Sequence, residues 1–339
     1  MLAKTPFIGY NMPNTILGIE TSCDETGASV VCGNEILSSV VSSSIALHRS
    51  YGGVIPEVAS RYHIEYINQV VRKALKKAKR PLKKLDAIAV TDKPGLVGSL
   101  LVGTSFARSL SFALDIPLIS VDHVMAHIYA NFLGRKEDLK FPFIGAVVSG
   151  GHTHIFIFRS FSDFKVIGRT RDDAIGEAFD KVAKILNLGY PGGPVIEKMA
   201  KRYSRLIRKR PLHFPMALLK DADYDFSLSG IKTAVLYYAR DKAASLKKET
   251  PRICYSFQEA VFDVLVKKII DASRAFKINR VVLGGGVVSN KRLRKKIAAR
   301  SREFGFELFY PEQALCLDNA AMVAGLGEEL LKERGGNLL

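Results

Sequence analysis

Residues 15–33, which read TILGIETSCDETGASVVCG, decide the fold class of this chain of 339 residues. Apolar and β-branched stretches stand on both sides of a short polar turn, a pattern that predicts a hairpin of two strands. Leu37–Ser43 extends the pattern to a meander of three strands. Predicted helices at 56–80, 98–114 and 123–133 then alternate with predicted strands at 86–91 and 117–121. This alternation is typical of parallel strands joined by crossover helices, so we expect an α/β fold.

The second half of the chain repeats this architecture without repeating its residues. Three predicted strands are again followed by helices that alternate with strands; these strands cover 143–149, 153–158 and 164–170. The stretch 172–225 has no counterpart in the first half, so we interpret it as an insertion. We expect an N-terminal extension (1–14), a first lobe (15–138) and a second lobe (139–339), with the boundary near Lys136–Pro142.

The composition predicts a folded cytoplasmic protein. Hydrophobic residues make up 47% and charged residues 24%, which excludes disordered, collagen-like and low-complexity chains. The four cysteines form no CxxC pair, so we expect free thiols in a reducing compartment. The most apolar stretch, Leu96–Val121, is interrupted by Arg108 and Asp115, and we expect a buried helix and a strand there rather than a membrane span.

Basic residues are in large excess and form clusters. There are 50 Lys+Arg against 33 Asp+Glu, a net charge of +17 that favours a polyanionic partner such as nucleic acid. The clusters are 72–84, 201–210 and 291–302. Each could be a solvated helix face, but the three together indicate a path for nucleic acid. Lys201, Arg202, Arg205 and Arg208, in the insertion, are the preferred contacts for such a nucleic acid.

Three glycine-containing turns could hold an anion. Ile19–Gly27 and Val148–Thr153 each join two predicted strands, and Leu283–Asn290 joins a strand to a basic helix. Glycines let the backbone approach a phosphate closely, and a helix behind the turn adds its N-terminal amides. Neither a Walker A motif nor a GxGxxG motif that opens a βαβ unit is present, so ordinary P-loop and Rossmann sites are disfavoured.

His123 and His127 lie four residues apart on a predicted helix, so both imidazoles share one face. Such a pair can bind a divalent metal, or can be two histidines satisfied by hydrogen bonds. Asp318 is a candidate third ligand, or the N-cap of the helix that follows it. Val124 stands where a zinc protease would have glutamate, so the protease general base is absent.

Taken together, the motifs resemble those of one known family. They are GIETSCDETGA (18–28), YGGVIPEV (51–58), PGLVGSLLVGT (94–104), DHVMAH (122–127), VVSGGHT (147–153), GEAFDKVAK (176–184), YPGGP (190–194), DFSLSGIKTA (225–234), GGGVVSN (284–290) and DNAAM (318–322). In these stretches the chain is similar to the TsaD/Gcp/Kae/Qri family, which forms threonylcarbamoyladenosine in tRNA and was once described as an O-sialoglycoprotein endopeptidase. The resemblance extends from Ile16 to Leu326.

The resemblance implies an actin/Hsp70/sugar-kinase (ASKHA) fold, two similar lobes with a nucleotide cleft between them. The implied reaction is transfer of the threonylcarbamoyl group from threonylcarbamoyl-AMP to N6 of adenosine 37 in tRNAs that read codons beginning with A. One divalent metal ion, iron first and zinc or magnesium in vitro, is implied at His123, His127 and Asp318. The implied substrate contacts are Val147, Val148, Ser149, Gly150, Gly151, Asp180, Gly193, Glu197 and Asn290.

The identity of the proton acceptor stays open, with Asp24 and Glu25 as the candidate catalytic carboxylates. The implied partners are tRNA, a TsaB-like paralogue on the helix around Arg61–Leu75 and a TsaE-like ATPase, without a membrane. Asp122 and Lys93 depart from residues common in the family. Three alternatives remain: a metal-dependent endopeptidase, an ASKHA kinase of a small molecule, and a non-catalytic nucleic-acid-binding module.

Overall fold

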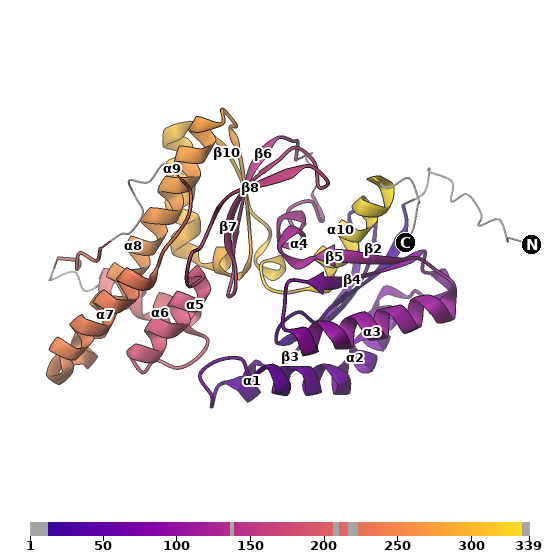
Figure 1. Cartoon of the computed structure of the whole chain (residues 1–339), viewed down its shortest axis with the longest axis horizontal. Helices are drawn as coiled ribbons and strands as arrows, with labels where there is room; N and C mark the ends of the chain where they lie inside the picture. Colours follow the sequence, from indigo (N-terminus) through magenta and orange to yellow (C-terminus); the bar gives the residue numbers. More distant parts are fainter. Residues whose placement is uncertain (1–12, 136–138, 206–209, 216–222, 334–339) are drawn as a thin grey trace, which may run out of the picture. The chain divides into compact units, whose positions relative to one another are not determined.

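The computed structural model describes residues 13–135, 139–205, 210–215 and 223–333. They divide into two units, each built on its own five-stranded sheet (Figure 1). The first unit holds the described residues among 1–44, 56–138 and 319–339, and the second holds residues 45–55 and those described between 139 and 318. Of the expected N-terminal extension, residues 1–12 lie outside the described part of the chain.

The first unit has the sheet order β3-β2-β1-β4-β5. Its strands are β1 (Thr15–Glu20), β2 (Glu25–Cys32), β3 (Glu35–Ser43), β4 (Ala87–Lys93) and β5 (Leu118–Asp122). Strand β1 pairs antiparallel with β2 and parallel with β4, as the predicted meander and crossovers require. The helices are α2 (Pro56–Ala78), η1 (Leu82–Lys84), α3 (Val97–Leu114), α4 (His123–Tyr129) and α10 (Ala320–Glu333).

Apolar side chains at helical spacing hold α2 on the sheet. Ile67, Val70, Val71 and Ala74 are buried and belong to one core with Leu17 and Ile19 on β1, together with side chains from β2, β4 and α3. This spacing is that of one helix face, which explains why the sequence pattern located the helix within two residues of its observed end. In Figure 1, α2 and α3 run beside one another.

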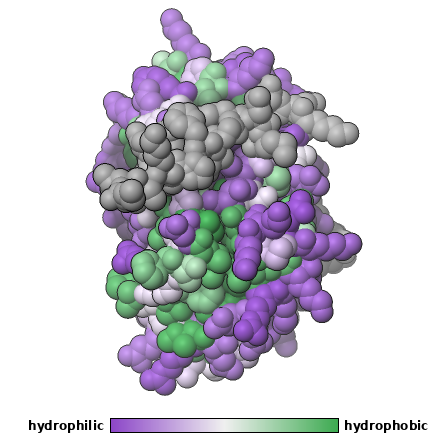
Figure 2. All heavy atoms as spheres, turned by 90° about the vertical axis from the view of Figure 1, so that its right-hand side faces the viewer, coloured by the Kyte–Doolittle hydropathy of each residue, from purple (hydrophilic) through white to green (hydrophobic). Residues whose placement is uncertain are grey.

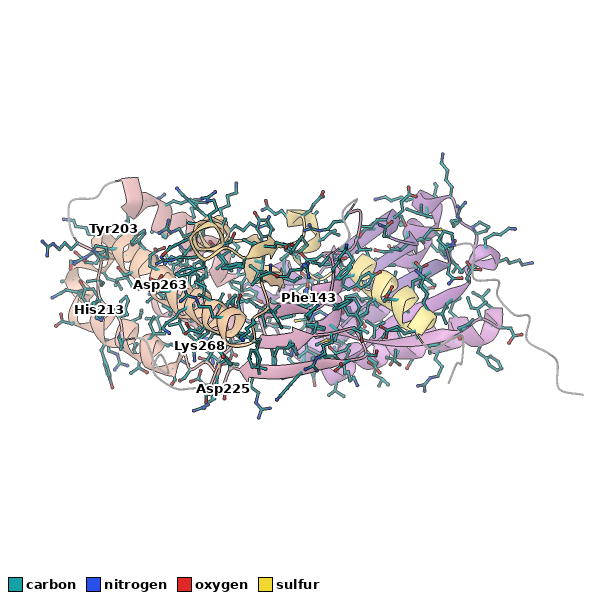
Figure 3. All side chains as sticks on the ribbon, turned by 90° about the horizontal axis from the view of Figure 1, so that it is seen from above. Phe143, Tyr203, His213, Asp225, Asp263 and Lys268 are labelled. Atoms are coloured by element: carbon teal, nitrogen blue, oxygen red, sulfur yellow. The ribbon has the colours of Figure 1, made fainter. Side chains whose placement is uncertain are left out.

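The second unit has the sheet order β10-β9-β6-β7-β8. Its strands are β6 (Phe143–Val148), β7 (Thr153–Phe158), β8 (Phe164–Arg169), β9 (Arg280–Gly284) and β10 (Glu307–Phe309). Its helices are α1 (Ile45–His48), α5 (Ile175–Ile185), α6 (Gly192–Arg205), α7 (Ser229–Asp241), η2 (Ala243–Ser245), α8 (Leu246–Ala275), η3 (Gly286–Ser289), α9 (Lys291–Phe304) and η4 (Gln313–Leu315). Figure 3 shows Phe143 on this sheet, where its side chain is fully buried, and Asp263 and Lys268 along α8.

The two sheets have the same topology. In each, the first strand pairs antiparallel with the second and parallel with the fourth, the second pairs antiparallel with the third, and the fourth pairs parallel with the fifth. The predicted repeat of architecture without a repeat of residues is therefore confirmed. The predicted α/β fold with two similar lobes is confirmed as well.

The C-terminal helix α10 belongs to the first sheet, whereas the sequence placed residues 139–339 together in the second lobe. A Cβ on Gly18 of β1 would lie 2.1 Å from the carbonyl oxygen of Ala320, so only glycine permits this approach. The order of elements along the sequence could not reveal that α10 packs on the first sheet. That position depends on which face of the sheet the other helices leave uncovered. Leu17 and Ile19 face α2 and α3, and Gly18 faces α10.

Helix α3 is not the buried helix that its composition suggested. Only Ser99, Gly103 and Ala107 are buried, and Phe112 is 90% exposed. By length and composition alone, α3 could cross a membrane, although it contacts β4 and α2 of the first sheet. Its small buried residues permit close packing on the unit. Val102, Phe106 and Leu110 pack against the core, whereas Val97, Leu101 and Phe112 are exposed.

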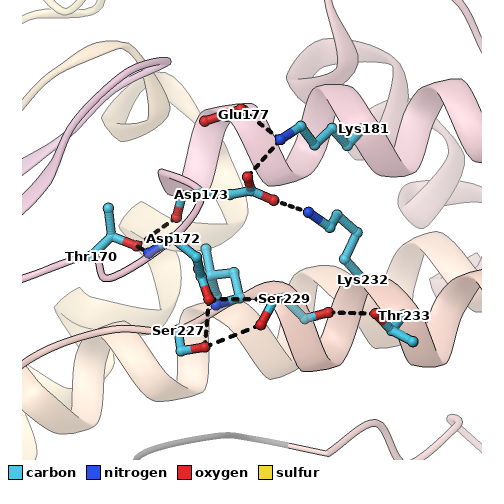
Figure 4. A network of polar contacts seen from close by, with 10 residues as sticks. Thr170, Asp172, Asp173, Glu177, Lys181, Ser227, Ser229, Lys232 and Thr233 are labelled. Atoms are coloured by element: carbon cyan, nitrogen blue, oxygen red, sulfur yellow. Dashed lines mark hydrogen bonds and ion pairs between the residues drawn. The ribbon is translucent and has the colours of Figure 1, made fainter.

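The start of the insertion is anchored by a polar network (Figure 4). Asp173 forms ion pairs with Lys181 of α5, at 2.6 Å, and with Lys232 of α7. Burial raises the pKa of Asp173, but the hydrogen bonds and charges of the two lysines outweigh it, so the pKa is lowered. Asp172 accepts hydrogen bonds from the Leu228 amide and the Ser227 hydroxyl. The network joins β8, α5 and α7 and fixes this part of the insertion.

Candidate functional site

The two histidines lie on a short helix that directly follows strand β5. The N-cap residue of α4 is Asp122, whose carboxylate accepts from the amides of Val124 (2.9 Å) and Met125 (3.1 Å). His123 and His127 are both buried, and their ring centroids lie 4.6 Å apart. An asparagine at position 122 could cap the helix in the same way, so the departure at Asp122 leaves the histidine helix intact.

His123, His127 and Asp318 each offer one ligand atom, and these atoms lie within 4.8 Å of one another. Asp318 is the residue at which the chain returns to the first unit, one peptide bond before Asn319. The side chain of Asn319 accepts from the amide of Met322 at 3.1 Å, a capping bond at the start of α10. Two imidazoles and one carboxylate form a donor set suited to a divalent transition metal.

Glu20, at the end of β1, orients His123. Its carboxylate is fully buried and lies 3.0 Å from Nδ1 of His123. The same carboxylate accepts from the Thr91 hydroxyl at 2.7 Å and from the Ser22 amide at 2.6 Å. With Glu20 ionised, its carboxylate can only accept, which selects the His123 tautomer that carries hydrogen on Nδ1 and a lone pair on Nε2. Sequence reasoning missed this residue, although an acid at the end of an apolar strand is a readable signal.

The turn between β1 and β2 is packed from several sides. Its Cys23 carbonyl accepts from Nε2 of the buried His63 (3.0 Å), whose Nδ1 lies 2.8 Å from the Thr26 hydroxyl. Asp24 is buried, and its carbonyl accepts from the amide of Ser44 at 2.9 Å. Glu25 is half-buried at the start of β2. The structure thus fixes the backbone around both candidate catalytic carboxylates.

The equivalent turn in the second unit, between β6 and β7, is open. A Cβ on Gly150 or Gly151 would meet no atom within 4 Å. Within the described chain, their amides donate no hydrogen bond, whereas the Ser149 amide is bonded to the His152 carbonyl at 2.8 Å. Val147 and Val148 are buried in β6 and place this turn at the end of the strand. The two glycine amides thus have no acceptor in the described chain, and no neighbouring atom lies where a Cβ of either glycine would be.

Helix α5 begins directly against this turn. The amides of Gly176 and Glu177 donate to the carbonyls of Ser149 and Gly150, both at 3.1 Å. Thr153 accepts from the Ile175 amide at 2.9 Å. A Cβ on Gly176 would lie 2.6 Å from the Ser149 carbonyl oxygen, which explains the glycine at this position. The first amides of α5 are thus occupied by the turn and cannot bind an anion themselves.

The other predicted substrate residues lie on helices linked to α5. Asp180 accepts from the Gly192 amide at 2.6 Å, and this bond joins α5 to the start of α6, where Gly193 faces open space. Glu197 of α6 accepts from the Lys291 amide at 3.3 Å. Asn290 precedes α9 and is its N-cap. These contacts bring Asp180, Gly193, Glu197 and Asn290 together within the second unit.

The loop before α9 completes this arrangement. Gly285 has φ +98°, and a Cβ there would lie 2.5 Å from the Val148 carbonyl oxygen. The loop from Gly284 to Asn290 therefore lies against the end of β6. The β6–β7 turn contacts the start of α5, α5 contacts the start of α6, and α6 contacts the start of α9. The loop before α9 contacts the end of β6, so these elements form a closed ring. All nine predicted substrate residues belong to this ring of elements, which sequence spacing alone could not have joined.

The side chains of Asn290 and Glu197 already have structural partners. Asn290 Oδ1 accepts from the amides of Arg292 (2.9 Å) and Leu293 (3.2 Å), and its Nδ2 donates to Gln258 at 3.0 Å. Glu197 forms an ion pair with Lys201 at 2.8 Å. A substrate contact by Asn290 would therefore share its amide group with the N-cap of α9. The assignment of all nine residues to substrate stays a prediction.

Comparison with known proteins identifies what the chain resembles. A family model described as "TsaD: tRNA N6-adenosine threonylcarbamoyltransferase" matches residues 35–325. A protein of Syntrophus aciditrophicus with the name tRNA N6-adenosine threonylcarbamoyltransferase is 48% identical over 320 residues, which cover 94% of this chain and 93% of that protein. A protein of Thermosipho melanesiensis with the same name is 50% identical over 315 residues, 93% and 94% of the two chains.

A solved structure supports the fold. Full-length HypF, in a phosphate- and nucleotide-bound form, matches with a TM-score of 0.61 at 16% identity. The match covers 97% of this chain, which spans 58% of the length of HypF. At this identity the likeness concerns the fold alone, and it agrees with the two-sheet ASKHA architecture described above.

Proposed function

We propose the substrates of this chain from its family, because it belongs to the TsaD family of tRNA N6-adenosine threonylcarbamoyltransferases, which are acyltransferases. The proposed donor is threonylcarbamoyl-AMP. The proposed acceptor is adenosine 37 of tRNAs that read codons beginning with A. The family match over residues 35–325 carries this proposal. We further propose that the reaction takes place in the cytoplasm, where its tRNA substrate is found.

We propose that the ring of elements in the second unit binds the donor. The donor is a mixed anhydride, so it needs its phosphate held and its carbonyl oriented rather than a covalent nucleophile. The open amides of Gly150 and Gly151 are suited to phosphate oxygens, because no Cβ blocks the approach. Asp180 and Glu197 are suited to the ribose hydroxyls, as hydrogen-bond acceptors. Val147, Val148, Ser149, Gly193 and Asn290 complete the proposed contacts.

The chemistry requires one bond to form and one to break. The N6 nitrogen of adenosine attacks the carbamoyl carbon, the C–O bond to phosphate breaks and AMP leaves with the electron pair. The amine must also lose a proton. Asp24 and Glu25 are the proposed acceptors, because these two carboxylates lie at the end of the β1–β2 turn and at the start of β2, within five residues of Glu20.

We propose that His123, His127 and Asp318 hold one divalent metal ion, with iron as the preferred metal. Two histidines and one carboxylate are the donor set of many iron(II) sites, and zinc and magnesium are the proposed substitutes in vitro. When bound, such an ion supplies positive charge and a fixed template for substrate groups. Glu20 holds the His123 ring through Nδ1, which prepares Nε2 to act as a ligand.

We propose that a TsaB-like paralogue docks on the first unit around Arg61–Leu75, and that a TsaE-like ATPase joins the assembly. Ile64 of this stretch is 65% exposed, and the adjacent α3 exposes Leu101 (64%) and Phe112 (90%). Figure 2 shows apolar side chains gathered on one face with hydrophilic residues around them. Exposed apolar area of this kind is typical of protein interfaces.

The test of the function is mass spectrometry of tRNA nucleosides after depletion of the protein. Loss of threonylcarbamoyladenosine, restored by the wild-type gene, supports the proposal. In vitro, the purified chain supplied with threonylcarbamoyl-AMP and tRNA should transfer slowly, and the TsaB-like and TsaE-like partners should restore repeated turnover. A phosphorylated small molecule formed from ATP would favour the kinase instead, and specific peptide-bond cleavage would favour the endopeptidase. Full turnover by the chain alone would refute the dependence on partners.

A further inference from the structure

Eight basic residues cluster at the C-terminal end of α2 and in the segment that follows it. We call this cluster the α2 basic patch: Arg72, Lys73, Lys76, Lys77, Lys79, Arg80, Lys83 and Lys84. All eight side chains are exposed. Within the part of the chain that the structure describes, none of these side chains forms an ion pair or a hydrogen bond.

The surroundings of the α2 basic patch contain little negative charge. The sequence from residue 66 to residue 85 has no Asp or Glu. Helix α3, which packs against α2, has no acidic residue and adds the exposed cation Arg108. Asp86 follows the patch, and its carboxylate accepts from the Thr15 amide at 2.7 Å. The positive charge of the patch is therefore not balanced by its own unit.

Helix stability does not explain this concentration of charge. Lys76 and Lys77 lie in the last turn of α2, where cations favour the helix dipole. The patch continues beyond the helix to Lys83 and Lys84 on η1, where that effect no longer applies. Within α2, Arg72 and Lys73 each have a like charge four residues on, an arrangement that destabilises a helix. The sequence thus keeps cations that the fold does not need.

The basic cluster on α9 is different, because acids on α8 face it. Arg292 makes two hydrogen bonds of 2.6 Å to Glu259, and Lys296 forms ion pairs with Glu259 and Asp263. Arg294 donates to two carbonyl oxygens and lies over the ring of Tyr310. Much of the α9 charge therefore holds α9 against its own unit.

The cluster in the insertion, which the sequence favoured, is only partly within the described chain. Lys201 is paired with Glu197 at 2.8 Å, and Arg202 is exposed. The side chain of Arg205 and residues 206–209, which include Arg208, lie outside the described residues. The α2 basic patch is therefore the largest described group of cations that the fold leaves for a partner.

We propose that residues 76–84 of the α2 basic patch, which lie outside the stretch proposed for the TsaB-like partner, dock the phosphate backbone of the tRNA substrate. The proposal rests on the proposed function, which supplies an RNA partner, and on the exposed cations without ion pairs described above. Each phosphate that a cation neutralises releases counterions, so affinity gained in this way falls steeply with salt. Backbone contacts position the RNA without reading its sequence, which leaves recognition of the adenosine to the donor site.

The experiment compares two variants of the full chain with equal net charge. The patch variant carries Lys76→Glu, Lys77→Glu, Lys83→Glu and Lys84→Glu. The control carries Lys→Glu at Lys165, Lys247, Lys248 and Lys277, which are exposed, have no described ion pair and lie outside the three basic clusters. Each set changes the charge by four times −2, from +17 to +9. Affinity for substrate tRNA is measured across a series of salt concentrations, and threonylcarbamoyl-AMP binding is measured in parallel.

The patch variant should bind tRNA at least about tenfold more weakly at roughly 0.1 M salt, with a slope of log affinity against log salt smaller by about 3. The control should stay within about twofold of wild type, and both should bind threonylcarbamoyl-AMP normally. Equal weakening in the two variants would show an effect of net charge alone and overturn the proposal. A patch variant that binds tRNA normally but loses a protein partner would overturn it as well.

Folding of both variants is checked by circular dichroism and thermal melting. If the patch variant does not fold, the four lysines are changed to Gln, which should reduce the salt slope by about the same amount because the same phosphate contacts are lost. An unchanged slope in the Gln variant contradicts the proposal. Transfer by the wild-type chain with its partners tests the function separately. If the wild-type chain performs the transfer and the patch variant binds tRNA normally, the proposed function stands and only the proposed docking surface is rejected.

Discussion

The two units place the same hairpin in their sheets and use it in opposite ways. In the first unit, the turn between β1 and β2 is filled: a Cβ on Gly95 would lie 2.6 Å from the Ser22 carbonyl oxygen, and one on Gly103 would lie 2.2 Å from the Thr21 hydroxyl. In the second unit, a Cβ on Gly150 or Gly151 of the corresponding turn would meet nothing within 4 Å.

The difference shows that one topology can carry a tightly packed turn in one unit and an open turn in the other. The packed turn lies next to Glu20, whose carboxylate holds His123 of the proposed metal site. The open turn leaves two glycine amides without an acceptor in the described chain, as the proposed donor site requires. Both turns join an antiparallel pair of strands, so the difference between them lies in the turn residues and in what packs against them.

The largest effect is expected from His123→Ala, which removes one of the three proposed metal ligands. Metal content of the purified chain, measured by elemental analysis, should fall below about one tenth of wild type, because two remaining ligands hold a divalent ion poorly. The control is His213→Ala, an exposed histidine of the second unit, which should leave the metal content unchanged. Wild-type metal content in His123→Ala would reject the site.

The next prediction tests packed against open glycines directly. Gly18→Ala should lower the free energy of unfolding by about 3 kcal/mol or more, because its Cβ would meet the Ala320 carbonyl oxygen at 2.1 Å. Gly151→Ala should change it by less than about 0.5 kcal/mol but raise the KM for threonylcarbamoyl-AMP. Urea unfolding and steady-state kinetics separate the two effects. An equal loss of stability in both variants would contradict the distinction between packed and open glycines.

A smaller effect is expected when Glu20 is changed to Gln. The variant keeps the shape of the side chain but loses the charge that holds Nδ1 of His123. Metal affinity, measured by competition with a chelator, should fall roughly 10- to 100-fold, as for other residues that orient metal ligands. Thr91→Val should weaken it less, because Ser22 still donates to the carboxylate. Unchanged affinity in Glu20→Gln would mean that the ring is held by other contacts.

The smallest effect concerns the charged network of the second unit. Asp173→Asn should lower the free energy of unfolding at pH 7 by about 1–3 kcal/mol, because two lysines lose their partner. The folded-state pKa of Asp173 is lowered, so its stabilisation is present above the unfolded pKa of about 3.9 and is lost as the pH falls through the folded value.

Urea unfolding at several pH values checks this prediction. The difference between wild type and Asp173→Asn should shrink below about pH 4. The control is Asp163→Asn, whose exposed ion pair with Arg159 should contribute less than about 1 kcal/mol. A difference that stays constant down to acid pH would show that the network acts through packing rather than charge.

Much of the fold was predictable because local patterns determine it. The apolar face of α2 and the alternation of strands and helices located the elements, and α3 was predicted from Gly98 to Leu114 against an observed Val97–Leu114. The exposure of α3 was mispredicted, since composition does not tell which side of a helix meets a sheet. The two histidines could be placed together because four residues make one helical turn.

The sequence by itself determined the family, the duplicated α/β architecture and the histidine pair, because each is written in residues close along the chain. The tertiary structure alone decided that Glu20 orients His123 from 103 residues away, and that α10 returns to β1. It also decided which cations have acidic partners. Such contacts join segments distant in sequence, so they depend on which faces remain uncovered once the sheets have formed.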